Sequence, residues 1–402
     1  MAYDVAALRA QFPSLASGIA HFDGPGGTQT PQVVADAVAR TLAGPLSNRG
    51  GLVASERNAD DTVAAFRRAY ADLLGVPATG IVYGRSATQL IYDVSRALAK
   101  QWSAGDEVVV TRLDHDADVR PWVQAAEARQ VTVRWVDIDP GTADLDPTSL
   151  AEAITERTRL VAVTGASNLL GTRPDIPALG ALAHRVGALL FVDGVHLAAH
   201  ELVDVPAMGA DLFVCSPYKF LGPHCGVLGG DPALLETLHP DKLLPATDAV
   251  PERFELGTLP YELMAGATAA VDFLAGLDGG DPSAPRRARL RAAFAAIHGH
   301  EERLSARLAE GLAGLGDAVV VHSVAAHRTP TTLLTLPGRS TDEAAEHLAS
   351  RHVLAPSGTF YAYEPARRLG LGDTGGLRAG LAPYTDDDDV DRLLDGLATF
   401  LG

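Results

Sequence analysis

Short apolar runs alternate with amphipathic stretches over the first two-thirds of the chain. Gly, Asp and Thr residues border these runs and limit them to the length of a buried strand. The apolar runs cover residues 80–83, 107–111, 131–136, 160–164, 188–192, 212–214 and 227–228. The helical patterns between them cover residues 87–100, 119–129, 150–156 and 176–186. Buried runs that alternate with helices predict an α/β fold with a mostly parallel seven-stranded sheet, covered on both faces.

The last third of the chain has a different pattern. Residues 276–285 are rich in Gly, Pro and Asp, which predicts a linker. A long helical pattern over residues 286–315 then leads to apolar runs at 318–321 and 331–336, which predicts a smaller α+β domain. We therefore expect an N-terminal segment that packs on the small domain, a large domain, the linker and the small C-terminal domain, over residues 1–16, 17–275, 276–285 and 286–402.

Charge and composition narrow the classes of function. The 402 residues include 50 acidic and 33 basic side chains, a net charge of −17, and no Lys/Arg-rich tract. We therefore expect neither nucleic acid nor an anionic membrane as a partner. The first residues lack a basic start followed by an apolar core, and no window holds the ~18 apolar residues that a membrane span needs. These features predict a cytoplasmic protein that handles small molecules or binds other proteins.

The residue types that bind metals are sparse. Cys215 and Cys225 are too few for a disulfide framework or a cysteine zinc cage. His196 and His200 are spaced i, i+4, but the HExxH order is absent and no third ligand is evident. The acidic residues 386–389 precede an apolar-periodic stretch, which predicts a helix N-terminus. We therefore expect no metal site.

Five polar features follow predicted strands, where α/β proteins place their functional groups. Lys219, in a Gly-rich turn, is either a solvated cation or a desolvated amine able to form a Schiff base. Asp193 ends a buried strand and needs a partner, such as a protonated ring nitrogen. His115 either stacks on a planar ligand or is a hydrogen-bonded structural histidine. Ser86 with Thr88 opens a helix, which fits a phosphate cradle or a plain N-cap. The fifth feature is residues 166–168.

Together these features predict a site for pyridoxal 5'-phosphate (PLP). The cofactor needs an amine for its aldehyde, a carboxylate for its pyridine nitrogen, an anion cradle for its phosphate and a flat surface on which to stack. Each feature is weak alone. All four requirements are met at predicted strand ends, so one shared cofactor site accounts for them together.

The chain resembles class V aminotransferase-fold enzymes of the cysteine desulfurase-like branch over nearly its whole length. The stretches that carry the resemblance are FDGPGGTQTPQVV (22–34), TRLDHDADVRPW (111–122), TGASNLLGT (164–172), FVDGVHLAAH (191–200), CSPYKFLGPHCGVL (215–228), RFELGTL (253–259) and LRAGLAPY (377–384). The resemblance implies a PLP-dependent fold of type I, like that of aspartate aminotransferase. It also implies a homodimer with shared active sites.

The resemblance further implies roles on the cofactor. Lys219 matches the Schiff-base lysine, Asp193 the partner of the pyridine nitrogen and His115 the stacking residue. His196 stands where desulfurases usually have Gln, and Tyr218 where they have His. The other implied cofactor contacts are Ser86, Ala87, Thr88 and Ser216 at the phosphate, Asn168 with His196 at the phenolic oxygen, Tyr218 before the lysine, and Gly257 with Thr258 from the neighbouring subunit.

On the substrate side, Arg378 matches the arginine that binds the α-carboxylate, a task suited to its planar guanidinium. Asn48, Thr359 and Tyr361 are further implied substrate contacts. Tyr361 takes the position of the persulfide-forming cysteine of desulfurases, and no cysteine follows Cys225. Desulfuration by that route is therefore excluded. Tyr361 is either a proton donor to a departing sulfur or a plain lining residue.

The remaining chemistry is removal of the Cα proton of an amino acid by Lys219. We expect a PLP-dependent carbon-sulfur lyase of secondary metabolism, acting on cysteine or a cysteine S-conjugate. The same residues serve decarboxylation with oxidative deamination to an aldehyde, epimerisation and transamination. A PLP-binding regulatory protein is the alternative without catalysis. Asp118 stands where relatives usually have Asn, so we expect an altered substrate end of the pocket.

Overall fold

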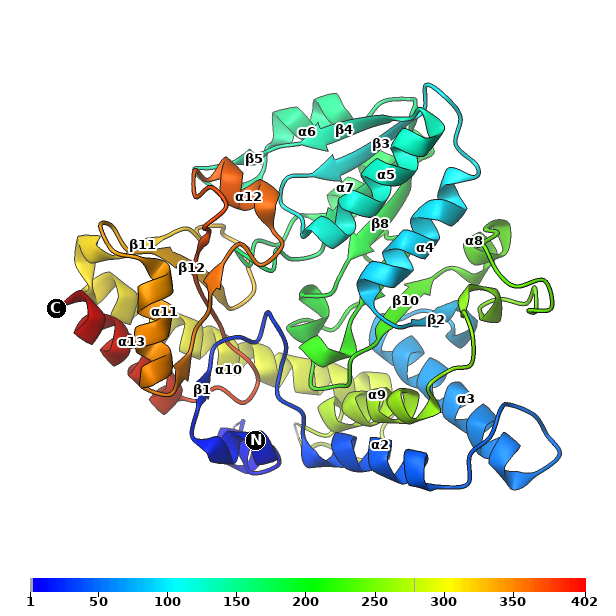
Figure 1. The fold of residues 1–402 in the computed structure, drawn as a ribbon, viewed down its shortest axis with the longest axis horizontal. Helices are drawn as coiled ribbons and strands as arrows, with labels where there is room; N and C mark the ends of the chain where they lie inside the picture. The colour runs from blue at the N-terminus through cyan, green and yellow to red at the C-terminus, as the bar shows by residue number, and fades with distance from the viewer. Residues whose placement is uncertain (1–2, 278) are drawn as a thin grey trace.

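A seven-stranded sheet forms the centre of the computed structural model, which describes residues 3–277 and 279–402. The strand order is β2-β10-β9-β8-β7-β3-β4 (Figure 1). β10 runs antiparallel to β2 and β9, and the other neighbours are parallel. The strands are β2 (Ile81–Gly84), β3 (Glu107–Thr111), β4 (Thr132–Val136), β7 (Thr158–Thr164), β8 (Leu189–Asp193), β9 (Leu212–Cys215) and β10 (Gly226–Gly230). The prediction of a mostly parallel seven-stranded sheet is confirmed.

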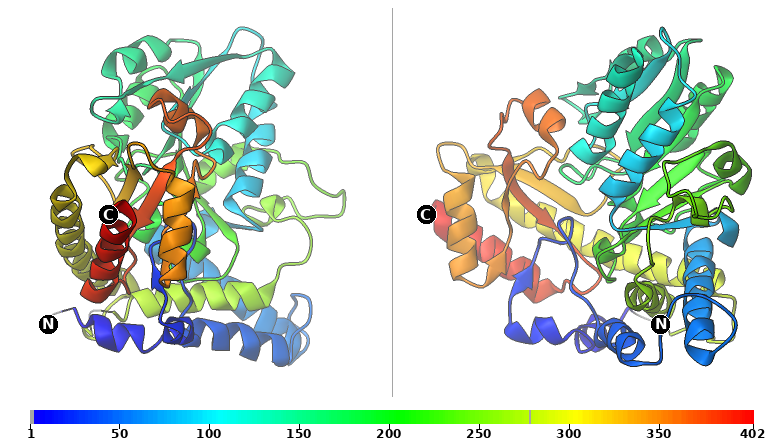
Figure 2. Two further views of the ribbon diagram at one scale, coloured as in Figure 1. Left: turned by 60° about the vertical axis from the view of Figure 1, so that its left-hand side comes forward. Right: turned by 45° about the vertical axis from the view of Figure 1, so that its right-hand side comes forward.

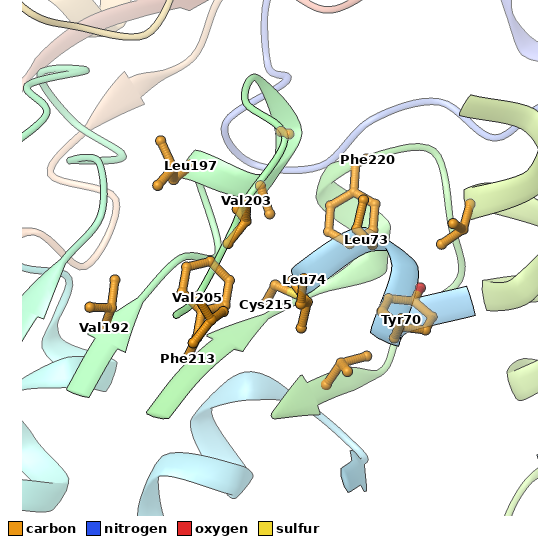
Figure 3. Close-up of a cluster of buried hydrophobic side chains, with 14 of the residues drawn as sticks. Tyr70, Leu73, Leu74, Val192, Leu197, Val203, Val205, Phe213, Cys215 and Phe220 are labelled. Carbon is orange, nitrogen blue, oxygen red and sulfur yellow. The ribbon is translucent and has the colours of Figure 1, made fainter. Parts of the chain in front are cut away.

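Apolar side chains cover both faces of this sheet, because successive residues of a strand point to opposite faces. Val192 and Phe213 pack with Tyr70 and Leu74 on one face (Figure 3). Phe191 and its neighbours pack against helices on the other face. The helices from the start of the chain to β10 are α1 (Val5–Arg9), α2 (Gln32–Ala43), α3 (Ala54–Leu74), α4 (Ala87–Ala99), α5 (Arg120–Arg129), α6 (Pro147–Ala153) and α7 (Ile176–Arg185).

A second, four-stranded sheet of order β11-β12-β15-β14 lies in the last part of the chain. Figure 2 shows α11 and α13 side by side against it. The long helix α10 reaches from α13 to α3 and α9. The helices after β10 and the strands of the second sheet are α8 (Pro232–Thr237), α9 (Tyr261–Leu274), α10 (Arg286–Gly314), β11 (Val320–Val321), β12 (Thr331–Thr335), α11 (Thr341–Ser350), β14 (Ser357–Gly358), α12 (Tyr363–Arg368), β15 (Gly376–Gly380) and α13 (Asp387–Leu401).

Two short pairings complete the fold, β1 (Ala20–His21) with β13 (Val353–Leu354) and β5 (Ile138–Asp139) with β6 (Asp144–Leu145). The first joins the start of the chain to the region of the second sheet. Asp278, within the expected linker 276–285, lies outside the described residues, as do residues 1–2. In the described chain, no helix combines the length and apolar character needed to cross a membrane.

The N-terminal segment contacts the beginning of α13. Arg9 donates to Tyr384 O at 2.7 Å and to Asp389 Oδ2 at 2.5 Å. Phe12 also packs edge to face on Phe273 of α9, with ring centroids 5.9 Å apart. The segment therefore touches helices on both sides of residues 276–285, and its assignment to the small domain stays a prediction.

Capping groups set two helix starts that bear on the predictions. The helix expected at residues 150–156 begins earlier, at Pro147, because Asp146 accepts from Thr148 N at 2.9 Å and proline suits the first helical position. The acidic residues 386–389 form a helix N-terminus as predicted. Asp386 accepts from Asp389 N at 3.0 Å and begins α13 with a capping box.

Candidate active site

A cavity of about 640 Å³ opens where β3, β7, β8 and β9 end. Arg378 of β15 and the loop residues Phe360 and Tyr361 form the opposite wall of the cavity. Groups that are distant in sequence therefore face one another across the cavity. The residues named from the sequence that line it are Ser86, Ala87, Thr88, His115, Asn168, Asp193, His196, Ser216, Tyr218, Lys219, Tyr361 and Arg378.

Four other named residues lie outside the lining of this cavity. Thr359 is buried and directly precedes the lining residue Phe360 in the sequence. Asn48, Gly257 and Thr258 are exposed on the surface of this chain. Their implied contacts with substrate or cofactor therefore stay predictions.

A closed turn holds Lys219. β9 ends at Cys215, and Pro217 to Lys219 form one 3-10 turn. Gly222 closes the turn against Pro217, where a Cβ atom would lie 2.8 Å from the proline Cβ and 3.0 Å from its oxygen. The absence of a side chain at this glycine therefore allows the chain to fold back tightly after the lysine.

The Lys219 amine is buried and points into the cavity wall. Nζ donates to Pro25 O and lies 4.9 Å from the centroid of the Tyr218 ring. Burial, followed by the charge of Arg378, lowers the pKa of Lys219 to about 7, against the opposing charge of Asp193. Near neutral pH a large share of this amine is therefore unprotonated, the form that acts as nucleophile or base.

Asp193 ends β8 with its carboxyl group facing the same cavity. Val195 N donates to Oδ1 at 2.9 Å. Gly194 is required by packing, because a Cβ there would lie 1.7 Å from the ring of Phe213, which is seen in Figure 3. Burial raises the pKa of Asp193 to about 6, while the Val195 N–H and the charge of Lys219 act in the opposite direction. A cationic ring nitrogen would stabilise the ionised carboxylate.

His115 offers a neutral ring to the cavity. Its Nδ1 accepts from Ala117 N at 3.0 Å, which fixes the ring at the start of the turn 116–118. Burial, followed by the charge of Lys219, lowers the pKa of His115 to about 4. A neutral, fixed imidazole fits the expected stacking role.

The start of α4 forms one corner of the cavity. Ser86 is the N-cap, and its hydroxyl accepts from Gln89 N at 3.1 Å. The N–H groups of the first helical turn have no acceptor within the helix and suit an anion. Gly226 allows β10 to approach closely, since a Cβ there would lie 2.4 Å from Ser86 C and 2.6 Å from Ala87 N. The N-cap and the phosphate cradle are therefore compatible.

Arg378 on β15 lies in the opposite wall, 2% exposed. Its Nη1 donates to Asn168 O at 3.0 Å, and its guanidinium lies 3.6 Å from the centroid of the Phe360 ring. Burial lowers its pKa to about 9. Among the residues that the structure describes, neither Arg378 Nε nor Asn168 Oδ1, both buried, has a hydrogen-bond partner. Buried polar groups normally have partners, so these two atoms indicate a ligand with an anionic group and a donor.

His196 faces the cavity with its other side anchored. Its Nε2 lies 2.9 Å from Thr329 Oγ1 and 3.0 Å from Thr331 Oγ1. Burial is the main reason that its pKa lies well below the usual value. His200 pairs instead with Glu301, Nδ1 to Oε2 at 3.0 Å. No group of three potential metal ligands occurs among the described residues.

The mouth of the cavity contains residues that no sequence motif indicated. Phe360 and Arg120 line it beside Tyr361, which is 68% exposed. Pro25 belongs to the Gly/Pro-rich loop before α2, whose composition marked it as irregular but did not place it at Lys219. Asp118 is wholly buried and does not line the cavity, so the expectation of an altered substrate end stays a prediction that does not involve direct contact with this residue.

The donor set fits PLP. A buried amine of lowered pKa, a buried carboxyl group, a fixed neutral ring and a helix N-terminus line one cavity. Arg378 Nε and Asn168 Oδ1, which have no partner within the described chain, suit an anionic group and a donor of the ligand. These residues can hold the cofactor together with an amino acid that carries its own carboxylate.

Comparisons with known proteins agree with this chemistry. The family model of class-V aminotransferases matches residues 20–393. The chain is 31% identical over 421 residues to the aminotransferase-like protein FGM3 of Gibberella zeae, with 99% of each chain covered. It is 32% identical over 405 residues to a probable cysteine desulfurase of Pseudomonas aeruginosa, covering 96% of this chain and 95% of that one.

A solved structure gives the same result. The cysteine desulfurase CsdA of Escherichia coli matches with a TM-score of 0.86 and 25% sequence identity, covering 99% of this chain and 98% of that chain. The expected fold of type I is confirmed, and the protein is a PLP-dependent enzyme. The chain belongs to the class-V aminotransferase family, in its cysteine desulfurase-like branch.

Proposed function

We propose that this enzyme is a carbon-sulfur lyase that acts on cysteine or a cysteine S-conjugate. The observation that carries the proposal is Tyr361 at the cavity mouth, in a chain without cysteine after Cys225. A sulfur leaving from the substrate therefore meets a phenol and has no thiol to accept it. PLP supplies an electron sink for the charge that forms at the substrate Cα.

Arg378 binds the α-carboxylate of the substrate. Its Nε has no partner in the described part of the chain, and its pKa of about 9 keeps the guanidinium mostly charged at neutral pH. Burial of the guanidinium strengthens its charge-assisted hydrogen bond to the carboxylate. Phe360 stacks on one face of the guanidinium, so the ligand approaches along its edge.

Lys219 removes the Cα proton. Its unprotonated amine is available near neutral pH, and general-base catalysis by a positioned group contributes about 10² to 10⁴ in rate. The electron pair of the Cα–H bond forms a double bond to Cβ, the Cβ–S bond breaks, and sulfur leaves with its electron pair. Tyr361 donates the proton to this sulfur. From cysteine, the released 2-aminoacrylate hydrolyses to pyruvate and ammonia.

A homodimer with shared active sites is part of the proposal. Asn48, Gly257 and Thr258 lie outside the cavity of their own chain. The ion pair between Arg49 and Glu252, Nη1 to Oε1 at 3.3 Å, brings their two segments to one surface. Exposed apolar residues support burial of this region by a second copy, and they are Leu42, Leu52, Val53, Leu243, Leu244 and Leu256.

Product analysis tests the reaction. The holoenzyme is incubated with S-substituted cysteines, and thiol, pyruvate, ammonia, aldehyde and carbon dioxide are assayed separately. We expect thiol, pyruvate and ammonia in equal amounts. Aldehyde and carbon dioxide without thiol would contradict elimination and favour oxidative decarboxylation. Continued thiol release by Lys219→Ala would contradict the base assignment.

A further inference from the structure

Asp114 and Asp118 are two buried carboxyl groups on either side, in sequence, of His115, which lines the cavity. Asp114 is 1% exposed and Asp118 0%. One oxygen of each accepts a hydrogen bond, Asp114 Oδ2 from Thr111 Oγ1 and Asp118 Oδ1 from Trp122 Nε1 at 2.9 Å. The remaining oxygens, Asp114 Oδ1 and Asp118 Oδ2, are buried and receive no hydrogen bond from a donor in the described chain.

A proton between the two side chains satisfies both oxygens. Two ionised carboxylates in contact within an apolar interior repel each other, and such pairs retain one proton. Burial raises the pKa of Asp114 to about 8, although the hydrogen bond from Thr111 lowers it. Burial, followed by the charge of Asp114, raises the pKa of Asp118 well above its usual value. Asp193 is a further acidic neighbour whose charge disfavours ionisation of both.

The position of the pair connects it to His115. Asp114 precedes the histidine, and Asp118 N donates to His115 O at 2.9 Å at the end of the turn 116–118. Thr111 ties Asp114 to the end of β3, and Trp122 ties Asp118 to α5. A hydrogen bond between the two carboxyl groups would therefore join the two ends of segment 114–118, which holds the His115 ring at the cavity.

We propose that Asp114 and Asp118 share one proton at neutral pH, and that this hydrogen bond is a positioning device for the His115 ring. The stacking role of His115 rests on PLP binding and not on the proposed lyase reaction. The shared proton rests on neither, because it is a property of the protein without cofactor. Asparagine at position 118 would donate an N–H to Asp114 and close the same segment without a titratable proton.

The apoprotein provides the first test. Infrared spectroscopy at pH 7 should show a protonated carboxyl C=O band in the wild type that is absent in Asp118→Asn and in the mirror variant Asp114→Asn. Asp61→Asn, an exposed position on α3, is the matched control and should keep the band. Asp193, with a pKa of about 6, is mainly ionised at this pH. A band that persists unchanged in both variants would overturn the shared proton.

Proton release on unfolding gives a second measure. Unfolded aspartates have a pKa of about 4, so the shared proton leaves when the wild type unfolds at pH 7. The wild type should release about one proton more than Asp118→Asn. The contribution of the pair to stability is therefore lost as pH rises from about 4 to about 8. Equal proton release by the two proteins would contradict the proposal.

The positioning role has its own readout. Visible circular dichroism of bound PLP reports the asymmetry of its surroundings. Titration of the holoenzyme above pH 8 should change this signal in the wild type and leave it nearly constant in Asp118→Asn. The same change in both proteins would overturn the link to His115, whereas loss of the infrared band would still support the proton. Failure of the lyase assay would affect neither result.

Discussion

The two sides of the cavity are built by different means. On the sheet side, Asp193 and Lys219 sit at strand ends, 5% and 9% exposed, in a turn and a packing arrangement that glycines make possible. At the mouth, Phe360 and Tyr361 have φ of 53° and 61°, and Tyr361 is 68% exposed. Positive φ at two successive residues with side chains is held by neighbouring contacts. We therefore expect general PLP chemistry to depend on the sheet side, and the choice of reaction to depend on the loop at the mouth.

Lys219→Ala tests the sheet side most severely. Removal of the base should lower exchange of the substrate Cα proton with solvent deuterium by at least about 10²-fold, followed by NMR. Lys100→Ala, at a partly exposed lysine paired with Asp241, is the control and should retain exchange. If Lys219→Ala kept near-normal exchange, the sheet side would not carry the proton transfer, and the contrast between the two sides would fail.

Arg378→Gln tests the wall of the cavity that lies opposite the sheet side. Loss of a charge-assisted hydrogen bond should reduce kcat/KM by about 10- to 100-fold, mainly through a higher KM. The exposed Arg339→Gln should behave as the wild type. An unchanged KM would show that the α-carboxylate binds elsewhere, and Phe360 would then cover an arginine of structural importance only.

The pH dependence of cofactor uptake sharpens the account of Lys219. Only the neutral amine attacks the PLP aldehyde, so the rate of uptake by the apoprotein should rise with pH and level off above about 7. Arg378→Gln should move the midpoint upward, because the charge of Arg378 lowers the pKa of Lys219. Stopped-flow absorbance measures both. A midpoint that stays constant in the variant would exclude this coupling.

The sequence predicted the sheet side well for a physical reason. Strands buried on both faces form continuous apolar runs, and their carboxyl ends meet at one edge, so Asp193 and Lys219 were expected to lie together. The contact of Pro25 with Lys219 and the stacking of Phe360 on Arg378 depend on how loops pack across large sequence separations. No local pattern encodes those contacts. The proposed pairing of Asp114 with Asp118 rests on the burial of both side chains, which no local sequence pattern shows.

Tyr361→Phe should have the smallest effect and tests the mouth. The variant keeps the ring beside His115, 5.5 Å between centroids, and removes only the hydroxyl. Water can partly replace an acid on a side chain this exposed, so the loss of thiol release should remain below about 10²-fold. The loss should be largest for substrates whose thiols are weakly acidic, because those leaving groups need a proton most.

A series of S-aryl and S-alkyl cysteines measures this dependence, with Tyr363→Phe on α12 as the exposed control. A loss that is equal across the series would assign Tyr361 to lining the mouth and not to proton donation. A loss confined to the alkyl substrates would assign proton donation to Tyr361 on the loop, because the sheet side is unchanged in this variant. The comparison between the two sides therefore depends on how the loss of thiol release varies with the acidity of the leaving thiol, more than on the size of that loss.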